Sequence, residues 1–266
     1  GIINFQPSEL AKFSLVLHLA VLLDRHKNFI KDFQVGLLPL LLWTGLICLL
    51  IALQPNISTT LVILMIAISI MFIGNANLLH LGGMTAVFAG MTAAYAFFVS
   101  KYPIERIQAF LGTAAATETE KLSHQVGQSL IAFGTGGFFG LGPGNSKQSW
   151  LFLPESYGDF IFSIIGEEYG YLGVLGVIAV FVLIMWRGMK TAKRAPDSFG
   201  YYLASGIVIT ISLYAFVNMG VNSGILPTTG LPLPFISFGG TAVIFYSAAV
   251  GILLNISAQA GIYPRK

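Results

Sequence analysis

Charged residues are scarce in this chain of 266 residues: only 9% are Asp, Glu, Lys or Arg, where a soluble domain carries about 25%. Hydrophobic residues make up 55%, and the mean hydropathy is +0.80. No charged residue occurs between Phe33 and Ser100, nor between Ser198 and Pro264. Each of these runs far exceeds the ~20 apolar residues that span a bilayer. The composition therefore excludes a soluble globular domain and predicts an all-α polytopic membrane protein.

The chain also lacks the sequence features of a disulfide, a nucleic-acid partner, a nucleotide site and a metal site. The single cysteine, Cys48, can form no internal disulfide, and its apolar surroundings indicate a small core residue. The formal net charge of +3 is too small to indicate a nucleic-acid partner. The glycine-rich stretch at 134–147 lacks the Gly-Lys-Ser/Thr of a P-loop. The four histidines have no metal-ligand spacing, so no metal site is predicted from them.

Seven apolar segments are predicted to span the membrane as helices. They are residues 8–24, 36–53, 59–74, 78–99, 160–186, 200–220 and 235–256. An eighth apolar stretch, 126–142, carries many glycines and is predicted to be a re-entrant or surface element. The backbone of such an element is tolerated only where protein or water covers it.

Basic residues set the expected orientation. They gather at 24–32, at 187–197 and at the C-terminus. All three clusters lie on the same side of the membrane only if residues 126–142 do not cross it. The positive-inside rule makes that side the cytoplasm. Residues 101–159 then form one long extracytoplasmic loop, and loops of that length are usually functional or disordered.

Asp159 lies where this loop enters the membrane, in the stretch "LPESYGDFIFSIIGEEYG" at 153–170, four residues after Glu155. A carboxylate at the water boundary can act as a general base. The alternative is a plain helix N-cap, a role that Asp also favours. Position alone leaves both open.

Glu167 and Glu168 lie further along the same predicted helix and face different sides of it, so they cannot both share a site with Asp159. We interpret them as structural partners of helix ends, hydroxyl groups or water. Gly166 and Gly170, four residues apart, are interpreted as small residues that allow close helix packing.

A second polar pair opens the chain, in "QPSELAK" at 6–12. Glu9 and Lys12 are three residues apart and share a helical face, where opposite charges can neutralise each other. Ionisable residues within the membrane are rare and usually indicate a functional site. The alternative is an internal ion pair that only orients the helix.

These motifs resemble the SEDS family of shape, elongation, division and sporulation proteins, and the resemblance covers essentially the whole chain. Four further stretches carry it: "QPNISTT" (54–60), "YPIERIQAFL" (102–111), "GQSLIAFGTGGFFGLGPGNS" (127–146) and "GILPTTGLPLPFISFGGTA" (224–242). Family members have ten transmembrane helices. The resemblance implies one membrane domain, residues 1–266, that corresponds to helices four to ten and lacks the first three. "FIFSIIGEE" and "GILLNIS" are more similar to the division branch than to the elongation branch.

The resemblance implies an inverting glycosyltransferase that polymerises peptidoglycan from lipid II at the outer face of the bacterial cytoplasmic membrane. It implies that Asp159 deprotonates the acceptor hydroxyl. It also implies a class B penicillin-binding protein and other division or elongation proteins as partners. No cofactor is expected, with a divalent cation (Mg²⁺ or Mn²⁺) left open. Further candidates for the substrate cavity are Glu9, Lys12, Gln54, Arg106, Glu155, Ser237, Gly239, Gly240 and Thr241.

The chain departs from the family pattern in three places. The usual Gln-Pro-Asp reads "QPN" at 54–56, the usual His-Thr before the aspartate reads "YG" at 157–158, and the usual Gly-Gly-Ser-Ser reads "GGTA" at 239–242. A lipid II flippase and a non-catalytic scaffold remain as alternatives. A transporter places polar residues near the midplane between repeats, whereas the acids here gather at the outer boundary, and no inverted repeat is found.

Overall fold

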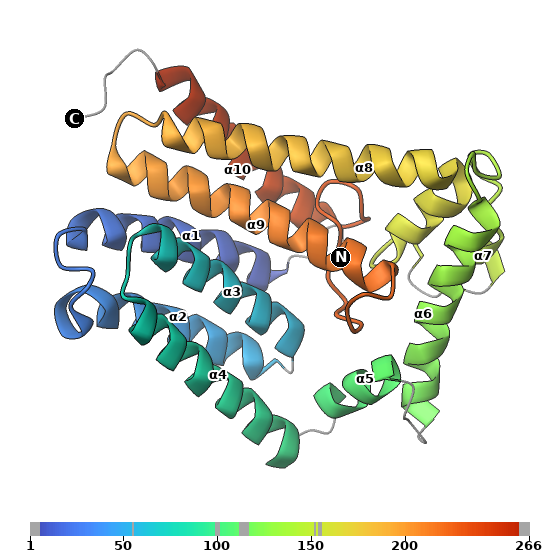
Figure 1. The fold of residues 1–266 in the computed structure, drawn as a ribbon, viewed down its shortest axis with the longest axis horizontal. Coiled ribbons are helices and arrows are strands. Elements are labelled where there is room, and N and C mark those ends of the chain that lie inside the picture. The colour runs from blue at the N-terminus through green and yellow to red at the C-terminus, as the bar shows by residue number, and fades with distance from the viewer. Residues whose placement is uncertain are drawn as a thin grey trace. The chain divides into compact units, whose positions relative to one another are not determined.

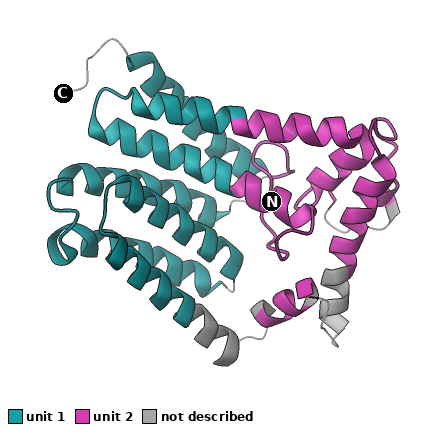
Figure 2. Cartoon of the chain, in the orientation of Figure 1, with its two compact units in different colours: residues 1–92, 183–213, 240–266 teal, residues 93–182, 214–239 magenta. Residues whose placement is uncertain are grey.

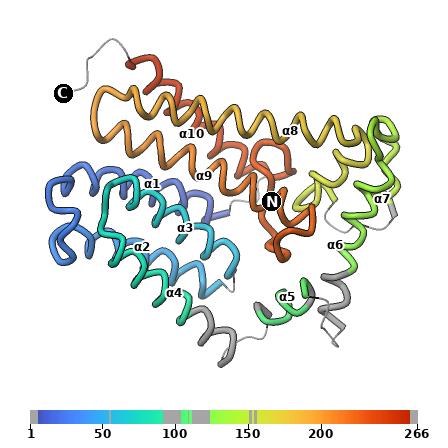
Figure 3. The backbone as a smooth tube through the Cα atoms, in the orientation of Figure 1, coloured from blue at the N-terminus to red at the C-terminus, as the bar shows by residue number. Residues whose placement is uncertain are grey.

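The computed structural model describes residues 6–54, 56–98, 102–111, 117–151, 153 and 156–260, and the regular elements in these ranges are helices (Figures 1 and 3). In chain order they are α1 (Pro7–His26), the π-helical turn η1 (Phe33–Leu37), α2 (Leu38–Ala52), α3 (Ile57–Ile73), α4 (Leu78–Phe98), α5 (Tyr102–Leu111), α6 (Thr117–Gly136), α7 (Lys147–Leu151), α8 (Ile161–Lys193), α9 (Ser198–Asn222) and α10 (Gly240–Gln259). The all-α prediction is confirmed.

The chain divides into two compact units (Figure 2). Unit 1 comprises residues 1–92, 183–213 and 240–266, and unit 2 comprises residues 93–182 and 214–239. The division falls within the helices α4, α8 and α9, so that each of them contributes to both units.

Unit 1 is a helical bundle built around α1, which contacts α2, α3 and α10. Leu15, Leu19 and Leu23 recur along one side of α1 and are at most 1% exposed. Gly206 of α9 allows close approach, because a Cβ there would touch the side chains of Val16 and Ile70. Small residues at such contacts are how membrane helices pack closely, since lipid offers no hydrophobic driving force between them.

Unit 2 contains a broken helix. Gly170, inside α8, has φ 65° and ψ −162°, values outside the helical region. The segment after α6 runs along the break: Leu141 N donates to the Glu167 carbonyl oxygen, Gly142 N donates to that of Glu168, and Tyr171 N donates to that of Gly137, each at 2.9 Å. These bonds occupy backbone groups that a break leaves unpaired, which is a requirement at membrane depth.

Residues 126–142, predicted as a re-entrant or surface element, form the second half of α6 and the segment that covers the break in α8. Their place in the membrane stays a prediction. Gly166 matches the packing interpretation, because a Cβ there would meet the ring of Phe133. Gly170 matches it as well, because a Cβ there would strike the backbone of Phe138 and Gly140. Its positive φ also breaks the helix at this point, which the sequence did not predict.

Each of the seven predicted spans coincides with a helix, although the ends differ. The last begins at Gly240 instead of residue 235, because Phe235 has φ 66° and Ser237 N donates to the Leu233 carbonyl oxygen at 3.0 Å in a turn. By length and composition, four helical stretches of the described chain can cross a membrane: Phe33–Ala52, Ile161–Lys193, Ser198–Asn222 and Gly240–Gln259. Two shorter apolar ones, Ile57–Ile73 and Leu78–Met91, accompany them.

Large apolar side chains are exposed on these helices. Leu42 is 64% exposed, Leu79 82% and Leu254 65%. A soluble monomer rarely exposes so much apolar surface, whereas lipid is a suitable environment for it. The number of spans stays a prediction.

Candidate active site

A polar cavity of about 190 Å³ lies in unit 2. It is lined by Arg106 of α5, Gln125 of α6, Asp159 and Phe160 at the entry to α8, Asn218 and Val221 of α9, and Thr228–Leu231 of the loop that follows α9. The structure thus brings together Asp159 and Arg106, which the sequence places 53 positions apart. Two opposite charges and several neutral polar groups share one small space.

The main chain of Asp159 is held by two asparagines. The Asp159 carbonyl oxygen accepts hydrogen bonds from Asn218 Nδ2 at 2.7 Å and from Asn222 Nδ2 at 2.8 Å. Asn218 Nδ2 also donates to the Leu231 carbonyl oxygen at 2.7 Å, and Asn222 Oδ1 accepts from Ser163 N at 3.1 Å. One pair of side chains, four residues apart on α9, therefore joins the start of α8 to the loop after α9.

The two residues before Asp159 are fixed in the same way. Phe238 N donates to the Tyr157 carbonyl oxygen at 2.9 Å, and Ser237 Oγ donates to the Gly158 carbonyl oxygen at 2.7 Å. Ser237 Oγ in turn accepts from Leu233 N at 2.7 Å. The predicted site residue Ser237 thus supports the backbone that carries Asp159.

Arg106 is anchored to the loop that follows α9. Its Nη1 donates to the Thr228 carbonyl oxygen at 2.7 Å. Two residues on, Gly230 has φ 68°, and a Cβ there would lie 3.4 Å from Asp159 Oδ2. The loop at 228–231 therefore bonds the guanidinium group and lies close to the carboxylate.

Glu167 serves a different purpose. It is fully buried, and its carboxylate accepts hydrogen bonds from the hydroxyl groups of Thr135 and Ser146 and from Lys147 N and Gln148 N. These amides belong to the first turn of α7, whose unpaired N–H groups favour an anion. The structural interpretation of Glu167, as a partner of a helix end and of hydroxyl groups, is confirmed.

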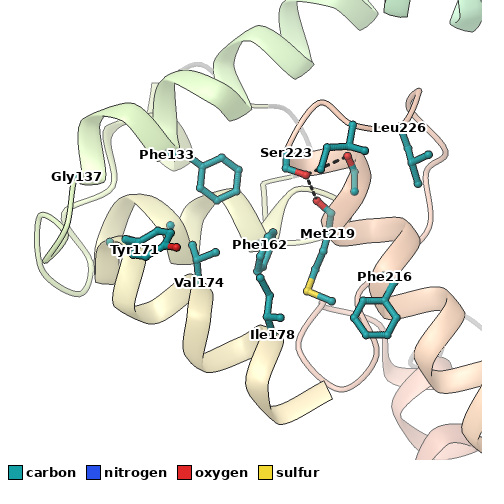
Figure 4. A pocket seen from close by; sticks show the side chains of 14 residues that line it. Phe133, Gly137, Phe162, Tyr171, Val174, Ile178, Phe216, Met219, Ser223 and Leu226 are labelled. Carbon is teal, nitrogen blue, oxygen red and sulfur yellow. Dashed lines mark hydrogen bonds between the residues drawn. The ribbon is translucent and has the colours of Figure 1, made fainter. Parts of the chain in front are cut away.

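Unit 2 also contains a larger pocket of about 610 Å³ (Figure 4). Phe133, Phe162 and Phe216 are among its apolar lining residues. Ser223 contributes a hydroxyl group, which donates to the carbonyl oxygens of Met219 and Gly220 at 2.8 and 3.2 Å. Among the described residues, this lining offers no carboxylate or cationic side chain, whereas the lining of the smaller polar cavity includes Asp159 and Arg106.

Glu9 and Lys12 form the predicted ion pair in unit 1. Lys12 Nζ donates to Glu9 Oε1 at 3.0 Å and to Oε2 at 2.8 Å. It also donates to Tyr246 Oη of α10 at 3.0 Å and lies 4.5 Å from the centroid of that ring. Lys12 is 1% exposed and Glu9 4%. The ion pair is confirmed, and the structure adds Tyr246 as a third member.

The family model for FtsW, RodA and SpoVE, described as "Cell cycle protein", matches residues 1–261 of this chain. The chain belongs to the FtsW/RodA/SpoVE family. It is 40% identical over 256 residues to a probable peptidoglycan glycosyltransferase FtsW of Geobacter sp. (strain M18), covering 96% of this chain and 69% of that protein. It is 41% identical over 263 residues to the protein of the same name in Allochromatium vinosum, covering 97% and 65%.

Solved structures agree with this family membership. A chain of a peptidoglycan synthase complex that coordinates polymerization and crosslinking matches with a TM-score of 0.77 and 26% identity, covering 98% of this chain and 72% of that one. Rod shape determining protein RodA of Thermus thermophilus matches with a TM-score of 0.65 and 26% identity, covering 98% and 68%. The chain thus spans about two thirds of the length of these relatives.

Two departures from the FtsW/RodA/SpoVE motifs have a structural account. Asn56, where the family pattern has Asp, is the N-cap of α3, and its Oδ1 accepts from Thr59 N at 3.2 Å. Asp and Asn fill that position about equally well. At Tyr157 and Gly158 it is the main-chain carbonyls that are held, so these contacts do not depend on which side chains are present.

The remaining candidates are spread over both units. In unit 1, Gln54 is exposed, Gly240 begins α10, and Thr241 is buried within it. In unit 2, Gly239 lies in the loop directly before α10. Glu155 lies outside the described residues. Their functional roles stay predictions.

A divalent cation has no evident site in the part of the chain that the structure describes, since no three His, Cys, Asp or Glu side chains come together there. The described lining of the cavity instead includes the carboxylate residue Asp159 and the guanidinium residue Arg106.

Sequence reasoning missed Asn218, Asn222, Gln125, Thr228 and Thr229. The two asparagines carry a readable signal, because they stand four residues apart in an otherwise apolar helix. A buried amide in such a helix needs partners, and same-face spacing indicates a common partner. Nothing in the local sequence of Gln125 or the threonines predicts that they line the cavity.

Proposed function

We propose that this chain is a peptidoglycan glycosyltransferase that polymerises glycan strands from lipid II during cell division. The observation that carries the proposal is the carboxylate of Asp159, in a polar cavity that also contains the guanidinium group of Arg106. The names of the relatives support the reaction class. The family membership supports a multi-pass protein of the cytoplasmic membrane.

In the proposed reaction, Asp159 accepts the proton of the acceptor sugar hydroxyl. The oxygen, as it loses that proton, forms a bond to the anomeric carbon of the donor. The bond from that carbon to the diphosphate breaks, and its electron pair leaves with the lipid diphosphate. Attack from the face opposite the leaving group inverts the anomeric centre. The tethers of the Asp159 carbonyl to Asn218 and Asn222 fix the position of the base, and such positioning contributes strongly to rate.

Arg106 supplies positive charge in the same cavity. Charge accumulates on the diphosphate oxygens as the bond breaks, and a fixed guanidinium group stabilises such charge. The bond from Arg106 Nη1 to the Thr228 carbonyl oxygen holds the side chain at the cavity wall. Arg106 is thus assigned to the leaving group and Asp159 to the acceptor.

The partner in this proposal is a class B penicillin-binding protein, which would crosslink the strands that this chain makes. The similarity to a chain of a complex that coordinates polymerization and crosslinking supports such a pairing. The distribution of basic residues supports a cytoplasmic C-terminus and an extracytoplasmic cavity.

The test is Asp159→Asn, which keeps the outline of the side chain and removes the base. Polymerisation of lipid II by the purified protein with its partner should fall by about 10²-fold or more, the scale of general acid–base catalysis. Folding should survive, because the asparagine tethers hold the Asp159 carbonyl and not its carboxylate.

Glu168→Gln is the matched control. It makes the same change of charge on α8, at a half-buried residue that does not line the cavity. Its polymerisation rate should stay within about twofold of wild type, because the residue lies outside the cavity lining. Near-normal polymerisation by the Asp159→Asn protein would refute the assignment, and the lipid II flippase would become the leading hypothesis.

A further inference from the structure

Two hydroxyl groups in the cavity have no role in the mechanism above. Thr228 Oγ1 and Thr229 Oγ1 are buried, and neither has a hydrogen-bond partner among the described residues. Both residues line the cavity with Asp159. Thr228 is 8% exposed, and its carbonyl oxygen is occupied by Arg106 Nη1. The main chain of Thr228 is thus held in place beside the cavity, while its hydroxyl group has no partner among the described residues.

Two other buried threonines of the chain are satisfied internally. Thr44 donates to the Leu40 carbonyl oxygen at 2.8 Å, and Thr210 donates to the Gly206 carbonyl oxygen at 2.7 Å. These are the usual bonds to the residue four positions earlier in a helix. Thr228 lies in the loop after α9, where the helical ladder has ended. Buried polar atoms without a partner occur elsewhere in the described chain, Ser205 Oγ and Ser212 Oγ among them, but those of Thr228 and Thr229 belong to residues that line the cavity with Asp159. Buried polar groups in native proteins nearly always have a partner, so at this cavity a ligand is the natural one.

We propose that the hydroxyl group of Thr228 binds the acceptor saccharide, by a hydrogen bond to a sugar oxygen near the hydroxyl that Asp159 deprotonates. The inference rests on the proposed function and names a substrate contact within it. Asp159 lines the same cavity as Thr228, and the proposed base deprotonates the acceptor hydroxyl, so the sugar assigned to Thr228 is the acceptor.

The chemistry of a threonine hydroxyl suits this ligand. It donates one hydrogen bond and accepts others, which matches sugar hydroxyl groups that do the same. A bond beside the reacting oxygen fixes the rotation of the ring and aims that oxygen at the donor. A site that hydrogen-bonds a hydroxyl group also discriminates against analogues that lack it, because its own polar group is then left unpaired. Thr229 supplies a second hydroxyl group in the same wall.

The experiment compares Thr228→Val with Thr228→Ser. Valine keeps the shape and removes the hydroxyl group, so kcat/KM for lipid II polymerisation should fall by about 2- to 15-fold, the scale of one neutral hydrogen bond. Serine keeps the hydroxyl group and should recover most of that loss. The thermal midpoint of Thr228→Val should be unchanged or higher, because an unpaired buried hydroxyl group has been removed.

Thr210→Val is the matched control, with the same change at a buried threonine whose hydroxyl group is already bonded within α9. It should lower the thermal midpoint and leave kcat/KM unchanged. A wild-type kcat/KM in Thr228→Val, or a loss that Thr228→Ser does not recover, would overturn the inference and leave the proposed function intact.

Failure of the proposed function is recognised separately, because wild-type protein would then form no polymer from lipid II. In that case, lipid II binding is measured as the rise in thermal midpoint when lipid II is added. The rise is compared between the Asp159→Asn protein and the Asp159→Asn/Thr228→Val protein. A smaller rise with Thr228→Val supports the contact. An equal rise refutes it.

Discussion

Lys12→Met should destabilise the protein far more than removal of the whole ion pair. Lys12 donates to both carboxylate oxygens of Glu9, and both side chains are almost completely buried. Methionine keeps the length of the lysine and takes away its charge. A carboxylate that is nearly sealed from water then loses its counter-charge, which is the costly state for a buried ion pair.

The expected magnitude follows from this burial. Breaking a buried pair by removal of one partner costs about 3–5 kcal/mol, whereas replacing both partners by apolar groups is often neutral. For a protein of this size, about 3–5 kcal/mol corresponds to a fall in thermal midpoint of roughly 6–20 °C. The double variant Glu9→Met/Lys12→Met should recover most of that fall, because no charge remains to be buried.

Lys27→Met provides the matched control. Lys27 and Asp24 are also three residues apart near the end of α1, at 3.8 Å, but their side chains are 50% and 39% exposed. An exposed pair contributes about 0–1 kcal/mol, so the thermal midpoint should shift by no more than about 4 °C. The assay is the thermal unfolding of purified protein in detergent, with polymerisation measured in parallel.

Two outcomes would refute the reasoning. If Lys12→Met and Lys27→Met shift the midpoint equally, burial does not control the cost of the lone carboxylate. If the double variant is no more stable than Lys12→Met, the unpaired buried carboxylate is not the cause of the loss.

Two further predictions concern the break in α8 and the orientation of the chain. Gly170→Ala should lower the free energy of unfolding by at least about 2 kcal/mol, because the residue has φ 65° and a Cβ would strike the backbone of Phe138 and Gly140. Gly176→Ala is the control: it lies on the same helix, its Cβ would meet open space, and it should leave the stability unchanged. Both are measured by thermal unfolding. In a Cys48→Ala background, a cysteine at exposed His124 should be labelled by an impermeant reagent in intact cells and one at exposed Arg194 should not, and the opposite pattern would overturn the predicted topology.

Much of the chemistry of this chain could be predicted from local sequence. The Glu9–Lys12 pair was predictable because its partners are three residues apart and a helix brings that spacing onto one face. The divergence of Glu167 and Glu168 was predictable for the same reason, since neighbouring residues on a helix point in different directions. The partners of Glu167 at the start of α7 were predicted only by type, because they come from 20 residues away.

The polar cavity could not be predicted in this way. Its walls come from α5, α6, the start of α8, the end of α9 and the loop after α9. The resemblance to a known family indicated Asp159 and Arg106, but not the residues that hold and surround them. Asn218 and Asn222 bond a carbonyl oxygen about sixty positions earlier in the chain, and no local pattern predicts that pairing.

The sequence by itself determined the solvent of this protein and its helices, because the scarcity of charge and the length of the apolar runs leave few alternatives. It did not determine which side of each helix is buried. In lipid both sides are apolar, so hydrophobicity carries no information about packing. Only the tertiary structure decided where α8 breaks and which backbone groups cover the break, because those hydrogen bonds join segments about thirty residues apart. The contacts around Asp159 were decided at the same level, since each requires the folded chain to bring distant polar groups within 3 Å of one another.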